Sequence, residues 1–180
     1  MINRIDVSSV LGSCGPFTNL LTRPTGAAVR SQIEQQLTGL RDSAVTVIDF
    51  SQVELLDFSC ADEVIAKLLL RFGSEPAKET YFVFRGVTAH LDAIETVLER
   101  HMLALVIQLD DGAAHLIGAV PEAERRLWET LRRIGGGVAS VVAAEIGANE
   151  HDTVEMLDGL SRRRLVMHSG DRYVAVGGAV

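Results

Sequence analysis

The sequence predicts an α/β protein, in which a mixed β-sheet with packed helices is followed by a small C-terminal helical unit. Over residues 1–120, short apolar segments rich in β-branched residues alternate with amphipathic helical segments, which is typical of a sheet covered by helices. At Pro121 this alternation stops and a charged helical segment begins. We therefore predict two domains, residues 1–120 and residues 121–180.

Hydrophobic periodicity places the elements of the first domain. Val29, Ile33 and Leu37 recur at helical spacing, and Gly39 follows them as a stop signal. Asp111-Gly112 is a strong turn signal between two apolar runs, which predicts a closing hairpin. We expect strands at residues 2–10, 45–50, 80–85, 104–109 and 113–117, and helices at residues 26–37, 59–71 and 87–101.

The second domain shows three helical segments and a hairpin in about 60 residues. We expect helices at residues 122–134 and 138–146, a third helix capped by Asn149, and strands at residues 165–168 and 172–176. A unit of this size buries only a small core by itself. We therefore expect it to pack against the first domain or against a second copy of the chain.

Composition excludes several classes of function. The longest apolar runs are far shorter than the roughly 18 residues of a membrane span, and residues 1–20 lack the order of a signal peptide. These features predict a cytoplasmic protein that does not enter a membrane. Cys14 and Cys60 form no metal or disulfide pattern, and the five histidines are scattered. With no phosphate-binding loop or nucleophile motif either, we expect a protein that is not an enzyme and needs no metal or cofactor.

Residues 45–63 carry a family resemblance. A buried strand is followed by Asp57-Phe58-Ser59-Cys60 and a helix, which resembles the Asp-Ser-Ser-Gly or Asp-Ser-Thr-Gly turn of the STAS family, best known for anti-sigma factor antagonists. Phe58 stands in place of the first serine and Cys60 in place of the glycine. Thr22-Arg23 and Ala61-Asp62-Glu63 resemble motifs of the divergent STAS-like domains of bacterial and archaeal regulators. The resemblance covers roughly residues 1–118 and implies a STAS-like mixed sheet.

The resemblance implies that Ser59 is a phosphorylation site for a partner kinase, but the residues also permit a structural role. A serine before a helix accepts hydrogen bonds from free backbone amides, and Ser59 with Asp62 approximates a capping box. Asp62 and Glu63 would repel a phosphate on Ser59, and no basic cluster is visible in the sequence to pair with it. The structural cap is therefore the favoured interpretation of Ser59. Together, Asp57, Ser59, Asp62 and Glu63 mark either a docking surface for a partner or a possible phosphosite.

Four residues at or near this corner have alternative roles. Asp57 is expected to accept backbone hydrogen bonds in the turn or to belong to the docking surface. Cys60 is expected to pack as a small apolar side chain, although its position at a helix start would favour an acidic thiol. Arg23 and Arg30 flank the start of the first long helix, where they are either solvated or contact an anion or an acidic partner.

Residues 122–177 look like a winged helix-turn-helix of bacterial transcription regulators. The expected recognition helix carries Glu150, Asp152, Glu155 and Asp158, which is the wrong charge for the major groove. The net charge of −7 points the same way. Backbone phosphates could still be contacted by four arginines: Arg162, Arg163, Arg164 and Arg172.

Two hypotheses follow from these observations. The first is a non-enzymatic regulatory protein that docks a protein partner, such as a histidine-kinase-like ATPase, in a partner-switching or signalling pathway. The second is a transcription regulator that binds DNA as a homodimer through residues 121–180.

Overall fold

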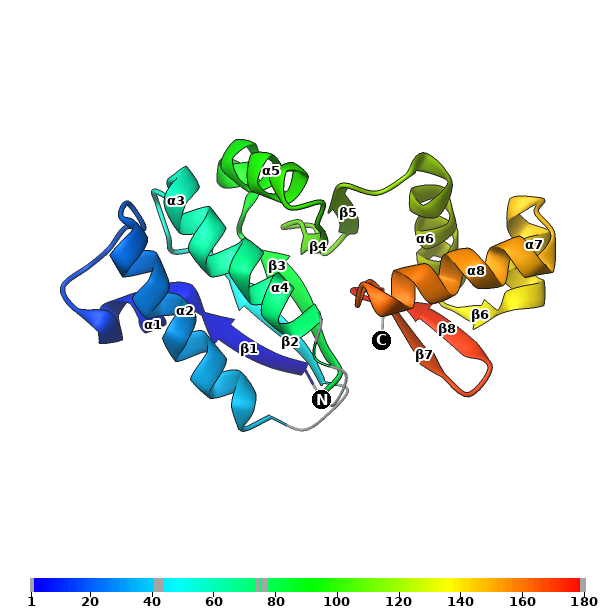
Figure 1. Ribbon diagram of the computed structural model, residues 1–180, viewed down its shortest axis with the longest axis horizontal. Helices are drawn as coiled ribbons and strands as arrows, with labels where there is room; N and C mark the ends of the chain where they lie inside the picture. The colour runs from blue at the N-terminus through cyan, green and yellow to red at the C-terminus, as the bar shows by residue number, and fades with distance from the viewer. Residues whose placement is uncertain (1, 41–43, 74, 76–77, 179–180) are drawn as a thin grey trace.

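The computed structural model describes residues 2–40, 44–73, 75 and 78–178. Its larger sheet has the strand order β1-β2-β3-β4-β5 (Figure 1). The first four strands pair in parallel, and β5 pairs antiparallel with β4. The strands are β1 (Ile2–Asp6), β2 (Ala44–Asp49), β3 (Thr80–Arg85), β4 (Ala104–Gln108) and β5 (Ala114–Gly118). The predicted α/β class, with a mixed sheet and packed helices, is therefore confirmed.

The helices of the first 118 residues cover one face of this sheet. They are α1 (Val7–Cys14), α2 (Arg23–Thr38), α3 (Phe58–Ala61), a π-helical turn η1 (Asp62–Ala66), α4 (Lys67–Gly73), a 3₁₀ turn η2 (Thr88–His90) and α5 (Leu91–Arg100). Parallel strands that follow one another in order are joined by crossovers of one hand, which place the helices on one side. Phe82 and Phe84 of β3 point into the core beneath these helices, whereas Tyr81 and Val83 point to the opposite face.

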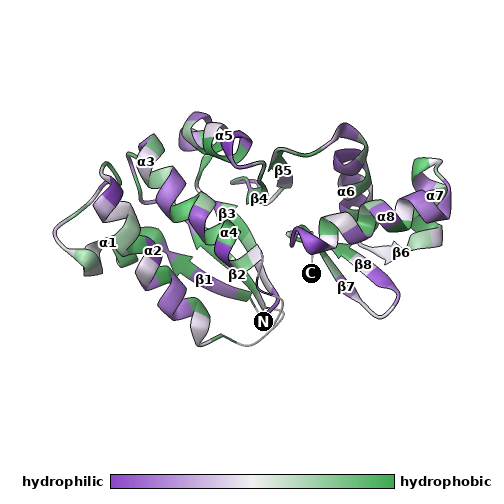
Figure 2. Ribbon diagram, viewed as in Figure 1, coloured by the Kyte–Doolittle hydropathy of each residue, from purple (hydrophilic) through white to green (hydrophobic). Residues whose placement is uncertain are grey.

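Residues 121–178 form three helices and a second, smaller sheet. The helices are α6 (Glu122–Ile134), α7 (Ala139–Ile146) and α8 (Glu150–Arg162). The strands β6 (Gly137–Val138), β7 (Val166–Ser169) and β8 (Arg172–Ala175) pair antiparallel in the order β6-β8-β7. The ribbon of α6 is largely hydrophilic (Figure 2), and its apolar stripe buries Leu127, Trp128 and Leu131.

The second face of the large sheet and the C-terminal unit share one apolar core. Tyr81, Val83 and Val106 of the sheet belong to the same cluster as Trp128 and Leu160 of the C-terminal helices. Arg125 of α6 also donates hydrogen bonds to the Leu116 and Gly118 carbonyls of β5. Of the two arrangements expected for residues 121–180, the structure has the one in which they pack against the first part of the chain.

Several predicted boundaries were wrong. The strand expected at residues 2–10 ends at Asp6, because the Asp6 carboxylate accepts a hydrogen bond from the Ser8 amide and caps α1. The first long helix begins three residues earlier than expected, at Arg23. The helix expected at residues 59–71 is interrupted by the π-helical turn η1, and a short strand, β6, precedes α7. The Asn149 cap of α8 is confirmed.

Candidate functional site

The candidate site is the corner where the chain leaves β2 and enters α3. Asp57 has an extended conformation, and its carboxylate accepts hydrogen bonds from the Cys60 amide and the Ser59 hydroxyl, both at 2.8 Å. The prediction that Ser59 caps this helix is therefore wrong. Asp57 caps it, because Ser59 already lies inside the helix, where its hydroxyl donates back to the Asp57 carboxylate. The turn role expected for Asp57 is confirmed.

The hydrogen bonds at this corner also set its protonation. Burial raises the pKa of the Asp57 carboxyl. The hydrogen bonds from the Cys60 amide and the Ser59 hydroxyl lower it by more, so the net pKa is below the ordinary value. Burial and the Asp57 charge raise the pKa of the Cys60 thiol to about 12. The lowered thiol pKa considered for a cysteine at a helix start is thus contradicted. Cys60 packs in the core, as expected, and its thiol donates to the Thr22 carbonyl.

Asp62 and Glu63 are buried rather than exposed in a first helical turn. Their residues are only 8% and 3% exposed, and Arg23 Nη1 donates to both carboxylates at 2.8 Å. Glu63 also accepts from Lys67 and, at 3.4 Å, from Arg30. These carboxylates therefore hold α2 against the π-helical turn.

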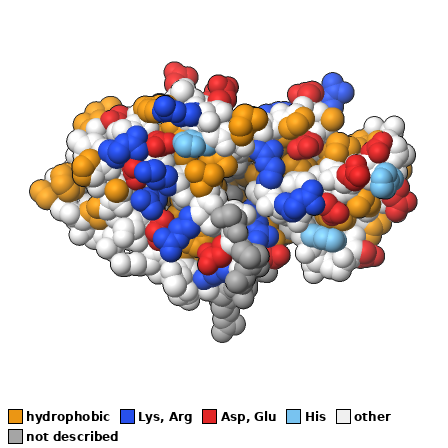
Figure 3. Space-filling model, viewed as in Figure 1, with side chains coloured by type: hydrophobic (Ala, Val, Ile, Leu, Met, Phe, Trp, Pro, Cys, Tyr) orange, Lys and Arg blue, Asp and Glu red, His pale blue; other side chains and the backbone are white. Residues whose placement is uncertain are grey.

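Further side chains extend this ion-pair network along α2 and α4. His101 Nε2 lies 2.7 Å from an Asp62 oxygen. Arg30 and Arg71 both donate to Glu34, which is itself 8% exposed. Figure 3 shows basic side chains gathered on this side of the molecule with acidic ones between them. The basic cluster that the sequence did not reveal is thus present, and its charges face buried carboxylates of the same chain.

A close approach of α2 makes this network possible. A Cβ atom at Gly26 would lie 3.1 Å from Glu63 Cβ and 3.2 Å from Cys60 Cα. Only glycine lets the α2 backbone approach the corner this closely without a shift. The π-helical turn begins at the same level, and turns of this kind are frequent at functional sites.

Exposed apolar side chains lie on two loops beside the corner. Leu20 and Leu56 pair in an isolated parallel bridge with both side chains buried. Their neighbours Leu21 and Leu55 therefore point outward, and they are 49% and 52% exposed. Phe17, in the same loop as Leu21, is 44% exposed. We call Phe17, Leu21 and Leu55 the loop patch. The sequence does not predict it, because neither loop has a regular apolar period.

The arginines expected to contact partners or DNA are mostly bound within the chain. Arg163 Nη2 donates to the Ala119 carbonyl at 2.8 Å, and Arg172 Nη2 donates to the Gly135 carbonyl at 3.0 Å. Arg164 lies 3.6 Å from the Glu79 carboxylate and over the Tyr81 ring. Of the side chains of Arg162, Arg163, Arg164 and Arg172, only that of Arg162 has neither a hydrogen bond nor an ion pair with the described part of the chain.

Comparisons with known proteins give no assignment. No family model matches the chain, and no curated protein matches it. Within residues 2–40, 44–73, 75 and 78–178, no group of three or more histidine, cysteine, aspartate or glutamate side chains could hold a metal ion. In the same residues, no helix is both long and apolar enough to cross a bilayer.

Proposed function

We propose that the protein is a non-enzymatic regulator that docks a protein partner at the corner formed by the loop patch, Asp57 and Ser59. The observation that carries the proposal is the exposure of Phe17, Leu21 and Leu55 on two neighbouring loops. Large apolar side chains gathered on a surface mark an interaction site more often than single ones do. The resemblance of residues 45–63 to the STAS turn supports the same corner.

The buried network behind the corner supports a docking role because it fixes the surface. Asp57 caps α3, and Arg23 joins α2 to Asp62 and Glu63. A surface held in one conformation loses little conformational entropy on binding. Arg23 keeps 46% of its side chain exposed, so it also gives the corner a cationic edge toward an acidic segment of a partner such as an ATPase-type kinase.

DNA binding by residues 121–178 remains the second candidate, and it is less well supported. The order of helices and strands there resembles that of a winged helix, which supports the candidate. However, α8 exposes Glu150, Asp152 and Glu155, and Arg163, Arg164 and Arg172 are engaged with groups of the same chain. A gel-shift titration with genomic fragments at low salt tests this candidate: binding that weakens steeply with salt and is lost on replacing Arg162 by Ala would favour it over docking.

Docking is tested with two matched variants, Leu55→Arg and Val141→Arg. Both residues are about half exposed, at 52% and 50%, but Val141 lies in α7, away from the loop patch. A photo-crosslinking amino acid is placed at position 21, in the loop patch, in the wild type and in both variants in cells of the native host, and cross-linked partners are identified by mass spectrometry. We expect one recurrent partner at position 21, lost in the Leu55→Arg variant and retained in Val141→Arg. Equal recovery with both variants would refute the assigned surface.

Phosphorylation of Ser59 is a separate part of the proposal. The Ser59 hydroxyl lies 2.8 Å from an Asp57 oxygen, so a phosphate there would replace a hydrogen bond by repulsion between like charges and would weaken the cap of α3. Phosphorylation would thereby change the docking corner itself. Intact-mass and peptide mass spectrometry of protein from its own host tests it: an unmodified Ser59 under all growth conditions would remove the switch and leave docking as proposed.

A further inference from the structure

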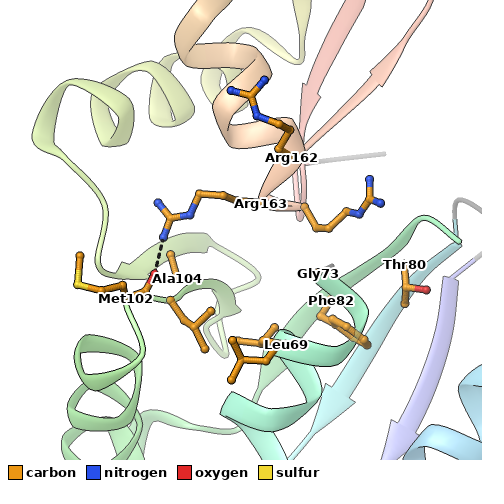
Figure 4. A pocket seen from close by; sticks show the side chains of 11 residues that line it. Leu69, Gly73, Thr80, Phe82, Met102, Ala104, Arg162 and Arg163 are labelled. Atoms are coloured by element: carbon orange, nitrogen blue, oxygen red, sulfur yellow. Dashed lines mark hydrogen bonds between the residues drawn. The ribbon is translucent and has the colours of Figure 1, made fainter. Parts of the chain in front are cut away.

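A cavity lies where the C-terminal unit meets the first part of the chain, away from the docking corner. It has a volume of about 290 Å³. Figure 4 shows Leu69, Phe82 and Ala104 on one side of it and the end of α8 on the other. This volume is just below the range for sites that bury drug-sized ligands, which begins at about 300 Å³, and it suits a smaller molecule. The cavity therefore has room for a small ligand that would touch both parts of the chain.

The rim of the cavity combines exposed apolar side chains with unusual backbone geometry. Met102 is 73% exposed and Leu70 is 44% exposed. Met102 and Arg164 are also the only non-glycine residues in the described part of the chain with positive φ, at 54° and 60°. Such conformations are unfavourable for these residue types and cluster at ligand sites. Both of them line this one cavity.

An arginine at the mouth of the cavity favours an anionic ligand. Arg163 extends from the end of α8 toward Met102 (Figure 4), where its Nη2 donates to the Met102 and Ala119 carbonyls. No partner of its Nε or Nη1 is found among the described residues. Arg164, by contrast, already pairs with Glu79 and lies over the Tyr81 ring, so of these two arginines the donor available to a ligand is Arg163.

We propose that this cavity binds a small amphipathic carboxylate. Its apolar body would contact Leu69, Phe82 and Ala104, and its carboxylate would accept hydrogen bonds from Arg163. A guanidinium and a carboxylate form strong charge-assisted hydrogen bonds. Because the lining comes from α4, β3, β4 and the end of α8, the bound acid would also strengthen the attachment of residues 121–178 to the sheet.

Calorimetric titration of the full chain with octanoate tests the proposal. Octanol has a similar apolar body without the charge, and acetate has the charge without the body. The Arg163→Gln variant removes the proposed ion pair, whereas Arg163→Lys keeps the charge. The Gly73→Leu variant adds bulk at the mouth, where a Cβ atom meets nothing within 4 Å. Arg126→Gln, an exposed arginine outside the cavity, is the matched control.

We expect octanoate to bind at least about tenfold more tightly than octanol, which lacks the hydrogen bond to a charged group, and than acetate, which lacks the apolar contact. Affinity should fall by a similar factor in Arg163→Gln and Gly73→Leu, partly return in Arg163→Lys, and stay unchanged in Arg126→Gln. Circular dichroism checks that each variant is folded. If Arg163→Gln does not fold, the affinity of Gly73→Leu for octanoate tests the cavity instead. The proposal is overturned if octanoate gives no saturable binding, if octanol binds equally well, or if the folded variants bind as the wild type does.

Discussion

The Arg23 guanidinium lies 2.8 Å from the Glu63 carboxylate, across 40 positions of the sequence. This contact joins the start of α2 to the π-helical turn, and the same Arg23 nitrogen also reaches Asp62. Glu63 is the more buried partner, with 4% of its side chain exposed against 46% for Arg23. The corner beside the loop patch is thus held by a buried anion surrounded by cations that reach water.

Replacing Glu63 by Gln should lower the free energy of unfolding by about 2 kcal/mol. Breaking a buried ion pair costs about 3–5 kcal/mol, and the cost here is smaller because Arg23 and Lys67 keep contact with water. Glu122→Gln is the matched control, since its pair with Arg126 is exposed on both sides and should contribute less than about 0.5 kcal/mol. Urea unfolding followed by circular dichroism measures both, and equal losses would contradict a structural role for the network.

Gly26 and Gly159 should respond to alanine with opposite signs. Alanine in a helix interior is more stable than glycine by about 1 kcal/mol, and a Cβ at Gly159 meets nothing within 4 Å. At Gly26 the new Cβ would press on the Cys60 backbone at 3.2 Å. We therefore expect Gly159→Ala to raise the midpoint of thermal unfolding and Gly26→Ala to lower it. A higher midpoint for Gly26→Ala would show that α2 can move away from the corner.

Stability should fall in mild acid because several native carboxyls have lowered pKa values. Burial raises the pKa of Asp62 and of Glu63, but hydrogen bonds lower both pKa values by more. Asp62 accepts from Arg23 and His101, and Glu63 accepts from Lys67 and Arg23. A carboxyl whose pKa is lower in the folded state stabilises it above the unfolded pKa, and this contribution is lost as the pH falls through the folded value. The loss should begin near the ordinary carboxyl range of about 4.

The Asp57→Asn variant isolates one part of this pH dependence. Asparagine caps helices nearly as well as aspartate, so the variant should stay close to wild-type stability at neutral pH. It should lose less stability than the wild type between pH 7 and pH 3, because the lowered pKa of Asp57 no longer contributes. Urea titrations across this range measure the difference. Parallel curves for the two proteins would mean that Asp57 is not ionised differently in the folded and unfolded states.

Local patterns in the sequence were enough to predict most elements of the fold. The periodicity of Val29, Ile33 and Leu37, the Asp111-Gly112 turn and the Asn149 cap each act within a few residues, and the structure has a helix, a hairpin and a cap at these places. The start of α1 was missed because Asp6 stops the strand by a side-chain hydrogen bond, which leaves the apolar pattern unchanged.

The candidate site was less predictable because its contacts are made across the fold. The sequence places Lys67 four residues after Glu63, a spacing that favours an ion pair on a helix, and this signal was available. Arg23 and His101 are each 39 positions from Asp62, and no local pattern brings them together. The loop patch depends on an isolated bridge between Leu20 and Leu56, which gives no periodic signal either.

The two cysteines should differ strongly in reactivity. Cys60 is fully buried, its pKa is raised to about 12 by burial and by the Asp57 charge, and its thiol donates to the Thr22 carbonyl. Since the thiolate is the reactive form, Cys60 should resist a chromogenic disulfide reagent in the folded protein, whereas the partly exposed Cys14 should react. We expect one fast thiol in buffer, two in urea, and none in buffer for the Cys14→Ser variant. A fast second thiol in buffer would mean that the corner opens readily, which would contradict a docking surface held in one conformation.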